Sequence, residues 1–227
     1  MNRHALFDLD GTLVDSLLVC TAILNDMLTD RELPKRLRAE EVRPFLSVGG
    51  ALMVSGLLPR ECGSADSALA EFRSRYALYD TPVSSLYPGV REGLGQLRDE
   101  GVTLAVCSNK PQALCDKVLD DVGLASFFAA VVGGAPGIPG KPAPDLFHYA
   151  LKKAGGRIDR CCFIGDGAPD HALSKALRVP FVFVTYGYAE PDWNFDDAMQ
   201  CDAFADVPAL VRTALNSHIF RPMARLD

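Results

Sequence analysis

Two aspartates one residue apart, Asp8 and Asp10, follow the apolar run His4–Phe7 and precede Gly11 and Thr12. Side chains alternate between the two faces of a strand, so in a continuing strand both carboxylates would share one face and repel each other. This arrangement indicates a site that requires negative charge.

Polar residues of several kinds follow the later apolar runs of the chain. Ser108 ends the second run, Lys141 lies in the loop after the third, and Asp166 ends the fourth, with Asp170 four residues later. If these runs are parallel strands, their ends meet at one edge of the sheet and surround one crevice. Crowded carboxylates favour a cation among them, and hard oxygen ligands suit Mg²⁺. A lysine and a hydroxyl beside the metal complete a phosphate site.

Short apolar runs alternate with helical patterns along most of the chain. After the first, these runs cover Thr103–Ser108, Phe128–Gly134, Arg160–Asp166 and Pro180–Thr185. They are nearly continuous, which is typical of strands buried on both faces of a parallel sheet. Because helical spacing of apolar residues lies between them, the sequence predicts an α/β fold with a doubly wound parallel sheet.

One long gap interrupts this alternation between residues 15 and 87, where the sequence shows no convincing buried strand. Leu17, Leu24 and Leu28 keep helical spacing, and a second helical stretch surrounds Leu69–Tyr79. We interpret the gap as a helical domain inserted after the first strand. The expected domains are an α/β core of residues 1–15 and 88–227 and a helical cap of residues 16–87.

Length, composition and charge limit the function classes. A chain of 227 residues, 48% of them hydrophobic, can bury a large core in one or two domains. A net charge of −6, without a basic run, argues against nucleic acid or an anionic membrane as partners. The sequence shows neither a signal segment nor an uncharged apolar stretch of about 18 residues, so we expect a cytoplasmic location. The seven cysteines lack CxxC spacing and suit reduced core thiols.

Four motifs make the chain similar to the haloacid dehalogenase-like hydrolases. They are, in order, DLDGT at residues 8–12, VCSN around Ser108, GKPAPDLF at Lys141 and IGDGAPD ending at Asp170. Within that family the chain most resembles phosphoglycolate phosphatases, whose helical cap lies between the first and second motifs. The resemblance implies a phosphatase that uses Mg²⁺ and acts on a small phosphate monoester, with phosphoglycolate as the leading substrate.

The resemblance also implies roles for the three aspartates of the first and fourth motifs. Asp8 would attack phosphorus and become an aspartyl-phosphate, which divides one hard displacement into two. Asp10 would protonate the leaving group and then accept a proton from the hydrolytic water. The metal would be held by Asp8, by the backbone carbonyl of Asp10 and by the carboxylate of Asp166.

The remaining motif residues would bind the phosphoryl group or support those that do. Ser108, Asn109 and Lys141 would hold phosphoryl oxygens. Thr12 would steady the phosphate or the general acid, and Asp170 would orient Lys141 or a metal-bound water. Taken singly, such residues are often turn, capping or surface residues. Their joint occurrence at successive strand ends favours the functional interpretation.

The expected cap contains a possible substrate-recognition segment. Gly49 and Gly50 could form a tight turn whose backbone approaches a ligand. Arg43, six residues before them, has two interpretations. It could bind a carboxylate at the far end of the substrate through two hydrogen bonds, or it could join Arg36 and Arg38 on a solvated helical face.

Three other functions share parts of this pattern. A sugar-phosphate mutase has the same four motifs and differs in how its cap keeps water from the aspartyl-phosphate. A metal-free 2-haloacid dehalogenase would use Asp8 but is disfavoured by Asp10. A phospho-acceptor signalling domain would need its acceptor on the third strand and would leave the helical insertion unexplained. The sequence is compatible with a monomer or a homodimer.

Overall fold

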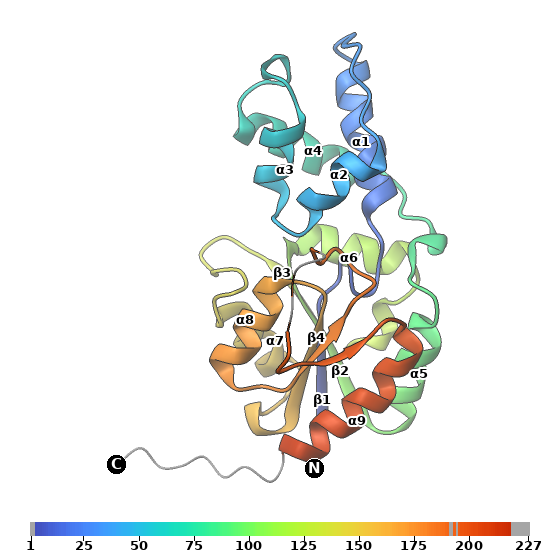
Figure 1. Ribbon diagram of the computed structural model, residues 1–227, viewed down its shortest axis with the longest axis vertical. Helices are drawn as coiled ribbons and strands as arrows, with labels where there is room; N and C mark the ends of the chain where they lie inside the picture. Colours follow the sequence, from blue (N-terminus) through green and yellow to red (C-terminus); the bar gives the residue numbers. More distant parts are fainter. Residues whose placement is uncertain (1–2, 191–192, 194, 219–227) are drawn as a thin grey trace.

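A computed structural model of the chain describes residues 3–190, 193 and 195–218. Its centre is a six-stranded sheet in which every neighbouring pair of strands is parallel (Figure 1). The strand order is β3-β2-β1-β4-β5-β6. The strands are β1 (Arg3–Phe7), β2 (Val102–Pro111), β3 (Ala130–Gly134), β4 (Cys161–Gly165), β5 (Phe181–Val184) and β6 (Met199–Cys201). The predicted doubly wound α/β fold is confirmed, and the order changes direction at β1, so the ends of β1, β2 and β4 are neighbours.

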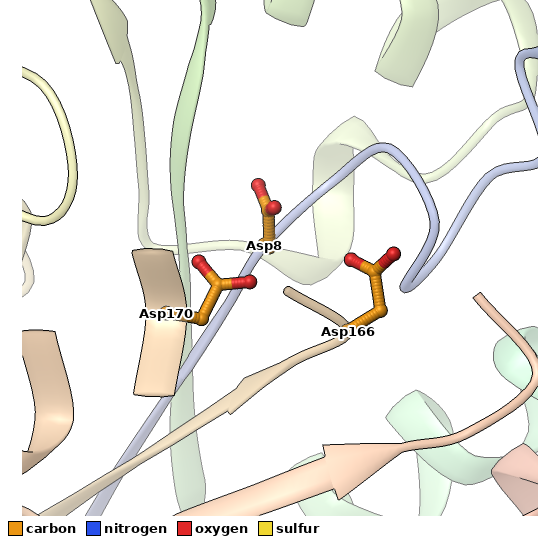
Figure 2. Close-up of side chains that lie close together, drawn as sticks. All are labelled: Asp8, Asp166 and Asp170. Atoms are coloured by element: carbon orange, nitrogen blue, oxygen red, sulfur yellow. The ribbon is translucent and has the colours of Figure 1, made fainter. Parts of the chain in front are cut away.

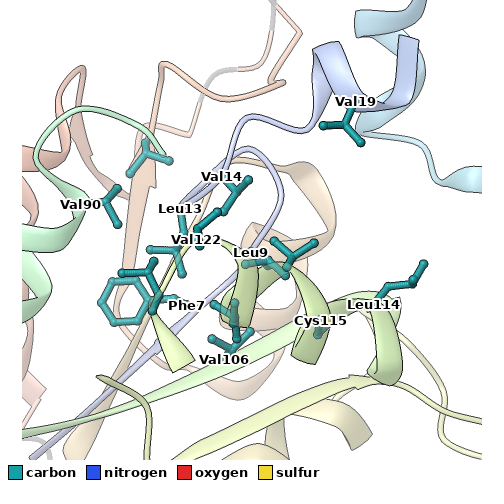
Figure 3. Packing of buried hydrophobic residues seen from close by; sticks show 14 of the residues in the cluster. Phe7, Leu9, Leu13, Val14, Val19, Val90, Val106, Leu114, Cys115 and Val122 are labelled. Atoms are coloured by element: carbon teal, nitrogen blue, oxygen red, sulfur yellow. The ribbon is translucent and has the colours of Figure 1, made fainter. Parts of the chain in front are cut away.

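Alternation along β1 places side chains in two separate hydrophobic cores. Ala5 and Phe7 pack on one face of the sheet, and Leu6 packs on the other. The first face is covered by α5 (Val90–Asp99), α6 (Gln112–Asp121) and α9 (Val207–His218). The second is covered by α7 (Asp145–Lys153) and α8 (Ala168–Leu177). Figure 3 shows the first core around Phe7 and Val106.

The sheet differs from the sequence prediction at two places. The edge strand β6 was not predicted because it has only three residues and no apolar run. It exists through parallel backbone pairing with β5, in which Val182 lies opposite Met199. In addition, β2 extends three residues past Ser108 to Pro111, after a shift in its register with β3.

Four helices follow β1 and lie together beyond the carboxyl ends of the strands (Figure 1). They are α1 (Leu17–Thr29), α2 (Ala39–Leu46), α3 (Gly50–Leu57) and α4 (Ala65–Tyr76). This confirms a helical cap inserted after the first strand. The apolar periodicity indicated only α1 and α4. The helices α2 and α3 have eight residues each, and Pro44 lies inside α2, so neither presents a long periodic pattern.

The remaining regular structure consists of single turns. Short 3₁₀ helices occur at Arg60–Cys62, Val83–Ser85, Ala125–Phe127, Ile158–Arg160 and Phe204–Asp206. All seven cysteines are buried and free of disulfides, as their sequence surroundings predicted. Within the ranges that the structure describes, none of the helices combines the length and the apolar character needed to cross a membrane.

Candidate active site

Three buried or half-buried carboxylates meet at the carboxyl edge of the sheet (Figure 2). Asp8 directly follows β1, Asp166 directly follows β4, and Asp170 lies in the first turn of α8. The two strands are paired, and the backbone N–H of Asp8 donates to the carbonyl oxygen of Ile164 at 2.9 Å. This pairing brings one carboxylate oxygen of each aspartate within 4.8 Å of the others.

Burial of Asp166 and Asp170 favours the neutral form of their carboxyl groups. It raises the pKa of Asp166 well above the ordinary range, and the charges of Asp8 and Asp170 raise it further. Burial is also the largest influence on Asp170, whose pKa rises to about 6 although Lys141 lowers it. A divalent cation among the three carboxylates would reverse this effect, and their hard oxygen donors are those that Mg²⁺ prefers. The site therefore fits a metal of this class.

Close backbone approach shapes the surroundings of Asp166. A Cβ atom at Gly11, where φ is +79°, would overlap the Asp166 carboxylate, and a Cβ atom at Gly187 would also overlap Asp166. The hydroxyl of Thr12 donates to Oδ1 of Asp166 at 3.2 Å, and the backbone N–H of Tyr188 donates to Oδ2 at 2.7 Å. Thr12 was predicted to steady the phosphate or Asp10, but its side chain instead orients a candidate metal ligand.

Lys141 is the cation of the acidic cluster. Its Nζ lies 2.8 Å from Asp8 and 2.7 Å from Asp170, and only 2% of its side chain is exposed. Burial alone would lower the pKa of Lys141, but the carboxylates of Asp170 and Asp8 outweigh burial and raise it. Lys141 is therefore held as an ammonium beside Asp8. The contact with Asp170 is the one expected if Asp170 orients this lysine.

The second motif places two neighbouring residues in different roles. Ser108 is buried and lines the same cavity as Asp8, where a phosphate-binding hydroxyl was expected. The side-chain amide of Asn109 instead bonds to the backbone of Lys141 in both directions, donating to its oxygen at 2.9 Å and accepting from its nitrogen at 2.7 Å. The Asn109 side chain thus fixes the loop that carries Lys141. Asn109 also lines the cavity, and its predicted contact with phosphate stays a prediction.

Asp10 lies outside the three-carboxylate cluster and has its own cation. Its two carboxylate oxygens accept from Nζ of Lys110 at 3.1 and 3.0 Å, and Oδ1 also accepts from the hydroxyl of Ser16. Burial alone would lower the pKa of Lys110, but the charge of Asp10 and the nearby Tyr76 raise it. The predicted metal contact through the Asp10 backbone carbonyl stays a prediction.

Sequence reasoning missed Lys110. The available signal was a lysine two residues after Ser108, at the end of the same strand. Its Nζ also lies 4.0 Å from the centre of the Tyr76 ring, which belongs to α4. The lysine therefore connects Asp10 to a cap helix, and this contact could not be read from spacing.

A cavity of about 540 Å³ lies between the sheet edge and the cap helices. Asp8, Asp10 and Lys141 line it from the core, and Gly49 and Gly50 line it from the cap. Gly49 has φ of +97° and precedes the first turn of α3, so its backbone conformation favours glycine. The structure differs from the predicted tight turn, because Gly49 caps α3 and Gly50 is the first residue of that helix. Both glycines still lie beside the space in which a ligand would bind.

The contacts of Arg43 differ from both predicted surroundings of this residue. Its Nη2 donates to the carbonyl oxygen of Gly187, and its guanidinium lies 5.7 Å from the centre of the Tyr188 ring. Arg43 does not line the cavity between cap and core, and it does not share the environment of Arg36, which bonds to nearby backbone oxygens. Its hydrogen bond joins α2 to the loop in which the backbone N–H of Tyr188 donates to Asp166.

Comparison with known proteins agrees with this geometry. Residues 3–176 match the family of haloacid dehalogenase-like hydrolases. The phosphoglycolate phosphatase of Rhodospirillum rubrum is 34% identical over 216 residues, which cover 91% of this chain and 90% of that protein. The phosphoglycolate phosphatase of Caulobacter vibrioides is 34% identical over 217 residues, covering 93% and 91%.

Solved structures also resemble this chain in fold. The crystal structure of a predicted phosphoglycolate phosphatase from Haemophilus somnus 129pt superposes with a TM-score of 0.75 at 26% identity, covering 91% of this chain and 96% of that one. CbbY from Rhodobacter sphaeroides, in complex with phosphate, shares the fold with a TM-score of 0.73 at 20% identity, covering 93% and 100%. The chain therefore belongs to the haloacid dehalogenase-like hydrolases, is similar to their phosphoglycolate phosphatases, and is a phosphoric monoester hydrolase.

Proposed function

We propose that this protein is a Mg²⁺-dependent phosphatase that hydrolyses phosphoglycolate, or a similar small phosphate monoester, through an aspartyl-phosphate. The observation that carries the proposal is the position of Asp8, which contacts Lys141 and shares one cavity with Ser108 and Asp10. A nucleophile, a phosphate-binding cation, a hydroxyl donor and a general acid are then present around one space. The phosphoglycolate phosphatases at 34% identity support the choice of substrate.

The metal site of the proposal consists of Asp8, Asp166 and the backbone carbonyl of Asp10. A bound Mg²⁺ would supply positive charge that offsets the negative charge of the phosphoryl oxygens. Thr12 and Tyr188 hold both oxygens of the Asp166 carboxylate. Their hydrogen bonds fix the direction of this ligand before any metal binds.

In the first step, a carboxylate oxygen of Asp8 attacks phosphorus as the bond from phosphorus to the ester oxygen breaks. Lys141 and Ser108 hold the phosphoryl oxygens and stabilise their charge. The leaving alkoxide takes a proton from Asp10. Asp10 enters this step as a carboxylic acid and leaves it as a carboxylate, and Lys110 and Ser16 hold its side chain in position.

In the second step, water attacks the phosphorus of the aspartyl-phosphate, and Asp10 accepts the proton of that water. The bond between phosphorus and Asp8 breaks, which regenerates the carboxylate and releases inorganic phosphate. The same residue thus acts first as acid and then as base, so its separate position beside Lys110 serves both steps.

We also propose that residues 16–87 move as a cap over a core of residues 1–15 and 88–227. The two connections between these parts run side by side. The N–H of Asp15 donates to the oxygen of Ser85 at 2.7 Å, and the N–H of Tyr87 donates to the oxygen of Leu13 at 3.2 Å. A pair of adjacent connections can act as a hinge for substrate entry and for exclusion of bulk water.

A screen of phosphate monoesters, read by release of inorganic phosphate with Mg²⁺ present, tests the proposed function. We expect phosphoglycolate to rank among the best substrates. Isomerisation of a sugar phosphate without phosphate release would indicate a mutase, and metal-independent halide release would indicate a dehalogenase. Either result, or no phosphate release from any ester, would overturn the proposal.

A further inference from the structure

One face of α4 forms part of the cavity wall. Leu69, Phe72, Arg73 and Tyr76 all line the cavity between cap and core. Their spacing of three, four and seven residues places them on one side of the helix. Arg73 is solvent-exposed, so a ligand in the cavity can reach it. The cap thus contributes an accessible guanidinium among apolar side chains.

The cationic side chains of the cavity differ in their partners. Lys141 is paired with Asp8 and Asp170, and Lys110 is paired with Asp10. For Arg73, no side-chain hydrogen bond or ion pair is formed with residues 3–190, 193 or 195–218. Its positive charge is therefore available to an anionic ligand.

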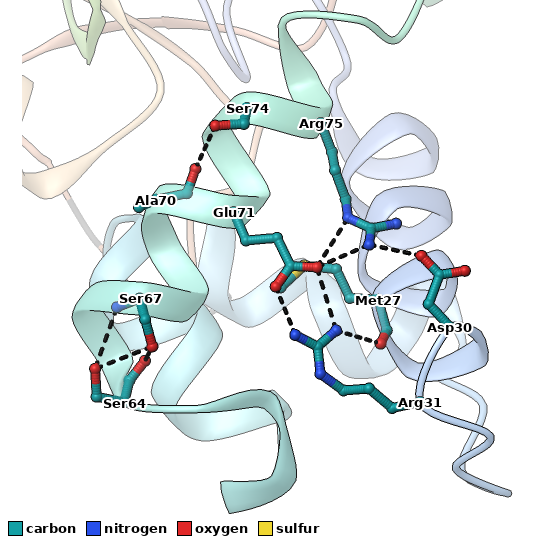
Figure 4. A network of polar contacts seen from close by, with 9 residues as sticks. All are labelled: Met27, Asp30, Arg31, Ser64, Ser67, Ala70, Glu71, Ser74 and Arg75. Atoms are coloured by element: carbon teal, nitrogen blue, oxygen red, sulfur yellow. Dashed lines mark hydrogen bonds and ion pairs between the residues drawn. The ribbon is translucent and has the colours of Figure 1, made fainter.

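A second arginine on the same helix provides the contrast. Arg75 lies two residues from Arg73 and contacts Glu71 at 2.8 Å and Asp30 at 2.6 Å (Figure 4). It is held on the side of α4 that packs against α1 and does not line the cavity. Both arginines thus belong to the same helix, but only Arg75 forms ion pairs with carboxylates.

We infer that Arg73 binds a second anionic group of the substrate, at the end remote from the phosphoryl group. This inference rests on the proposed phosphatase function and narrows its substrate class to monoesters whose leaving group carries a carboxylate or a second phosphate. The guanidinium fork can bind either anion through two hydrogen bonds.

This position also connects substrate recognition with the arrangement of cap and core. Arg73 belongs to a cap helix, whereas Asp8 follows the first strand of the core. A ligand that contacts both residues stabilises the arrangement in which the cap covers the sheet edge. Binding energy from the remote anion is then used to assemble the reactive site.

Three matched substrates test this inference with Arg73→Gln. They are phosphoglycolate, ethylene glycol bisphosphate and 2-hydroxyethyl phosphate, which share a two-carbon leaving group and differ in its charge. We expect the wild type to prefer at least one of the two anionic compounds over the neutral one. The variant should lower kcat/KM for that compound by roughly 10-fold to 100-fold, as loss of a charged hydrogen bond predicts, and leave 2-hydroxyethyl phosphate within about 3-fold. A loss for phosphoglycolate would show that Arg73 binds a carboxylate, and a loss for ethylene glycol bisphosphate would show that it binds a second phosphate.

Arg75→Gln is the matched control, because it removes the same charge from the other side of α4. It should leave the ratio between anionic and neutral substrates unchanged. An equal loss on all three substrates, or no loss on any, in Arg73→Gln would overturn the inference. The same holds if the wild type does not prefer an anionic leaving group.

A binding measurement separates failure of this inference from failure of the proposed function. In an Asp8→Asn background with Mg²⁺, calorimetry would measure the binding of phosphoglycolate, of ethylene glycol bisphosphate and of inorganic phosphate. Adding Arg73→Gln should weaken binding of one of the two larger anions about 10-fold and leave inorganic phosphate unchanged. A protein that releases phosphate from no ester but shows this selective loss would refute only the phosphatase proposal. Equal weakening of all three ligands would refute the role of Arg73.

Discussion

Two clusters of this protein combine carboxylates with cationic side chains but differ in their charge balance. On the cap, two acids are matched by two arginines, with Arg31 at 2.6 Å from Glu71 and Arg75 bridging Glu71 and Asp30 (Figure 4). At the sheet edge, three carboxylates lie close together (Figure 2), and Lys141 contacts two of them, Asp8 and Asp170. The cap cluster is balanced in charge, whereas the sheet-edge cluster carries an excess of negative charge.

The pKa shifts follow this difference. Hydrogen bonding from Arg31 lowers the pKa of Glu71, with a further contribution from Arg75. Burial and the charges of neighbouring carboxylates raise the pKa of Asp166 instead. A cluster that favours its charged form stabilises the fold by itself, but one that disfavours it needs a ligand. Charge balance, rather than the number of ionisable groups, therefore distinguishes the structural cluster from the functional one.

The largest effect is expected from Asp8→Asn in the unbalanced cluster. The amide has nearly the same shape but is a poor nucleophile, so kcat should fall by at least about 1000-fold. Thermal unfolding should show that the fold is retained, because the amide is isosteric with the carboxylate. Phosphate release measures the first effect. Turnover above a tenth of the wild-type value would exclude Asp8 from the mechanism.

Removal of the metal should have the next largest effect. Exhaustive chelation is expected to lower phosphate release by roughly 100-fold, and Mg²⁺ should restore it. Ca²⁺ should inhibit, because its longer bonds and higher coordination number let both oxygens of Asp8 bind and engage the attacking atom. Mg²⁺ should also raise Tm for the wild type more than for Asp166→Asn. Full activity after chelation would contradict the proposed metal site.

Arg43 belongs to neither cluster, and its removal should weaken the contact of α2 with the loop at Gly187. We expect Arg43→Ala to lower kcat/KM by roughly 3-fold to 10-fold, equally for phosphoglycolate and 2-hydroxyethyl phosphate. This pattern differs from the selective loss expected for Arg73→Gln. A loss confined to phosphoglycolate would instead restore the interpretation of Arg43 as a substrate contact.

The raised pKa of buried Asp170 should also appear in the pH dependence of stability. The pKa of Asp170 is about 6 in the folded protein, above the value of about 3.9 for an unfolded chain. Between these values the folded state binds more protons, so this group lowers the free energy of unfolding of the metal-free protein as pH rises from about 4 to about 6.

Asp170→Asn tests this dependence. The decline of stability with pH should become shallower by up to about 1 kcal/mol per pH unit. Urea unfolding at several pH values, with chelator present, measures the slope. An unchanged slope would show that Asp170 does not carry this proton linkage.

The smallest effect is expected in the balanced cluster. Glu71→Gln should reduce the free energy of unfolding by about 1 kcal/mol or less, because the ion pairs of Glu71 are partly exposed to solvent. This loss of stability should become smaller at high salt, because salt screens exposed ion pairs. The variant should keep the kcat/KM of the wild type. A large loss of activity in this variant would mean that the cap network also serves the reaction, and the contrast between the clusters would fail.

The sequence by itself determined the fold class and the location of the acidic cluster. Apolar runs set the parallel strands, and Asp8 and Asp166 come directly after two of them. Once those strands pair, covalent continuity alone carries both carboxylates to one edge of the sheet. The order of residues along the chain was sufficient for this inference, because a short aspartate side chain directly after a strand stays at the end of that strand.

Only the tertiary structure decided the contacts of the long polar side chains. Lys110 meets Asp10 across 100 positions, Asn109 meets the backbone of Lys141 across 32, and Arg43 meets Gly187 across 144. A flexible side chain reaches several partners from one backbone position. The packing of the cap helices against the core selects among these partners. The spacing of residues within the cap or within the core does not predict that packing.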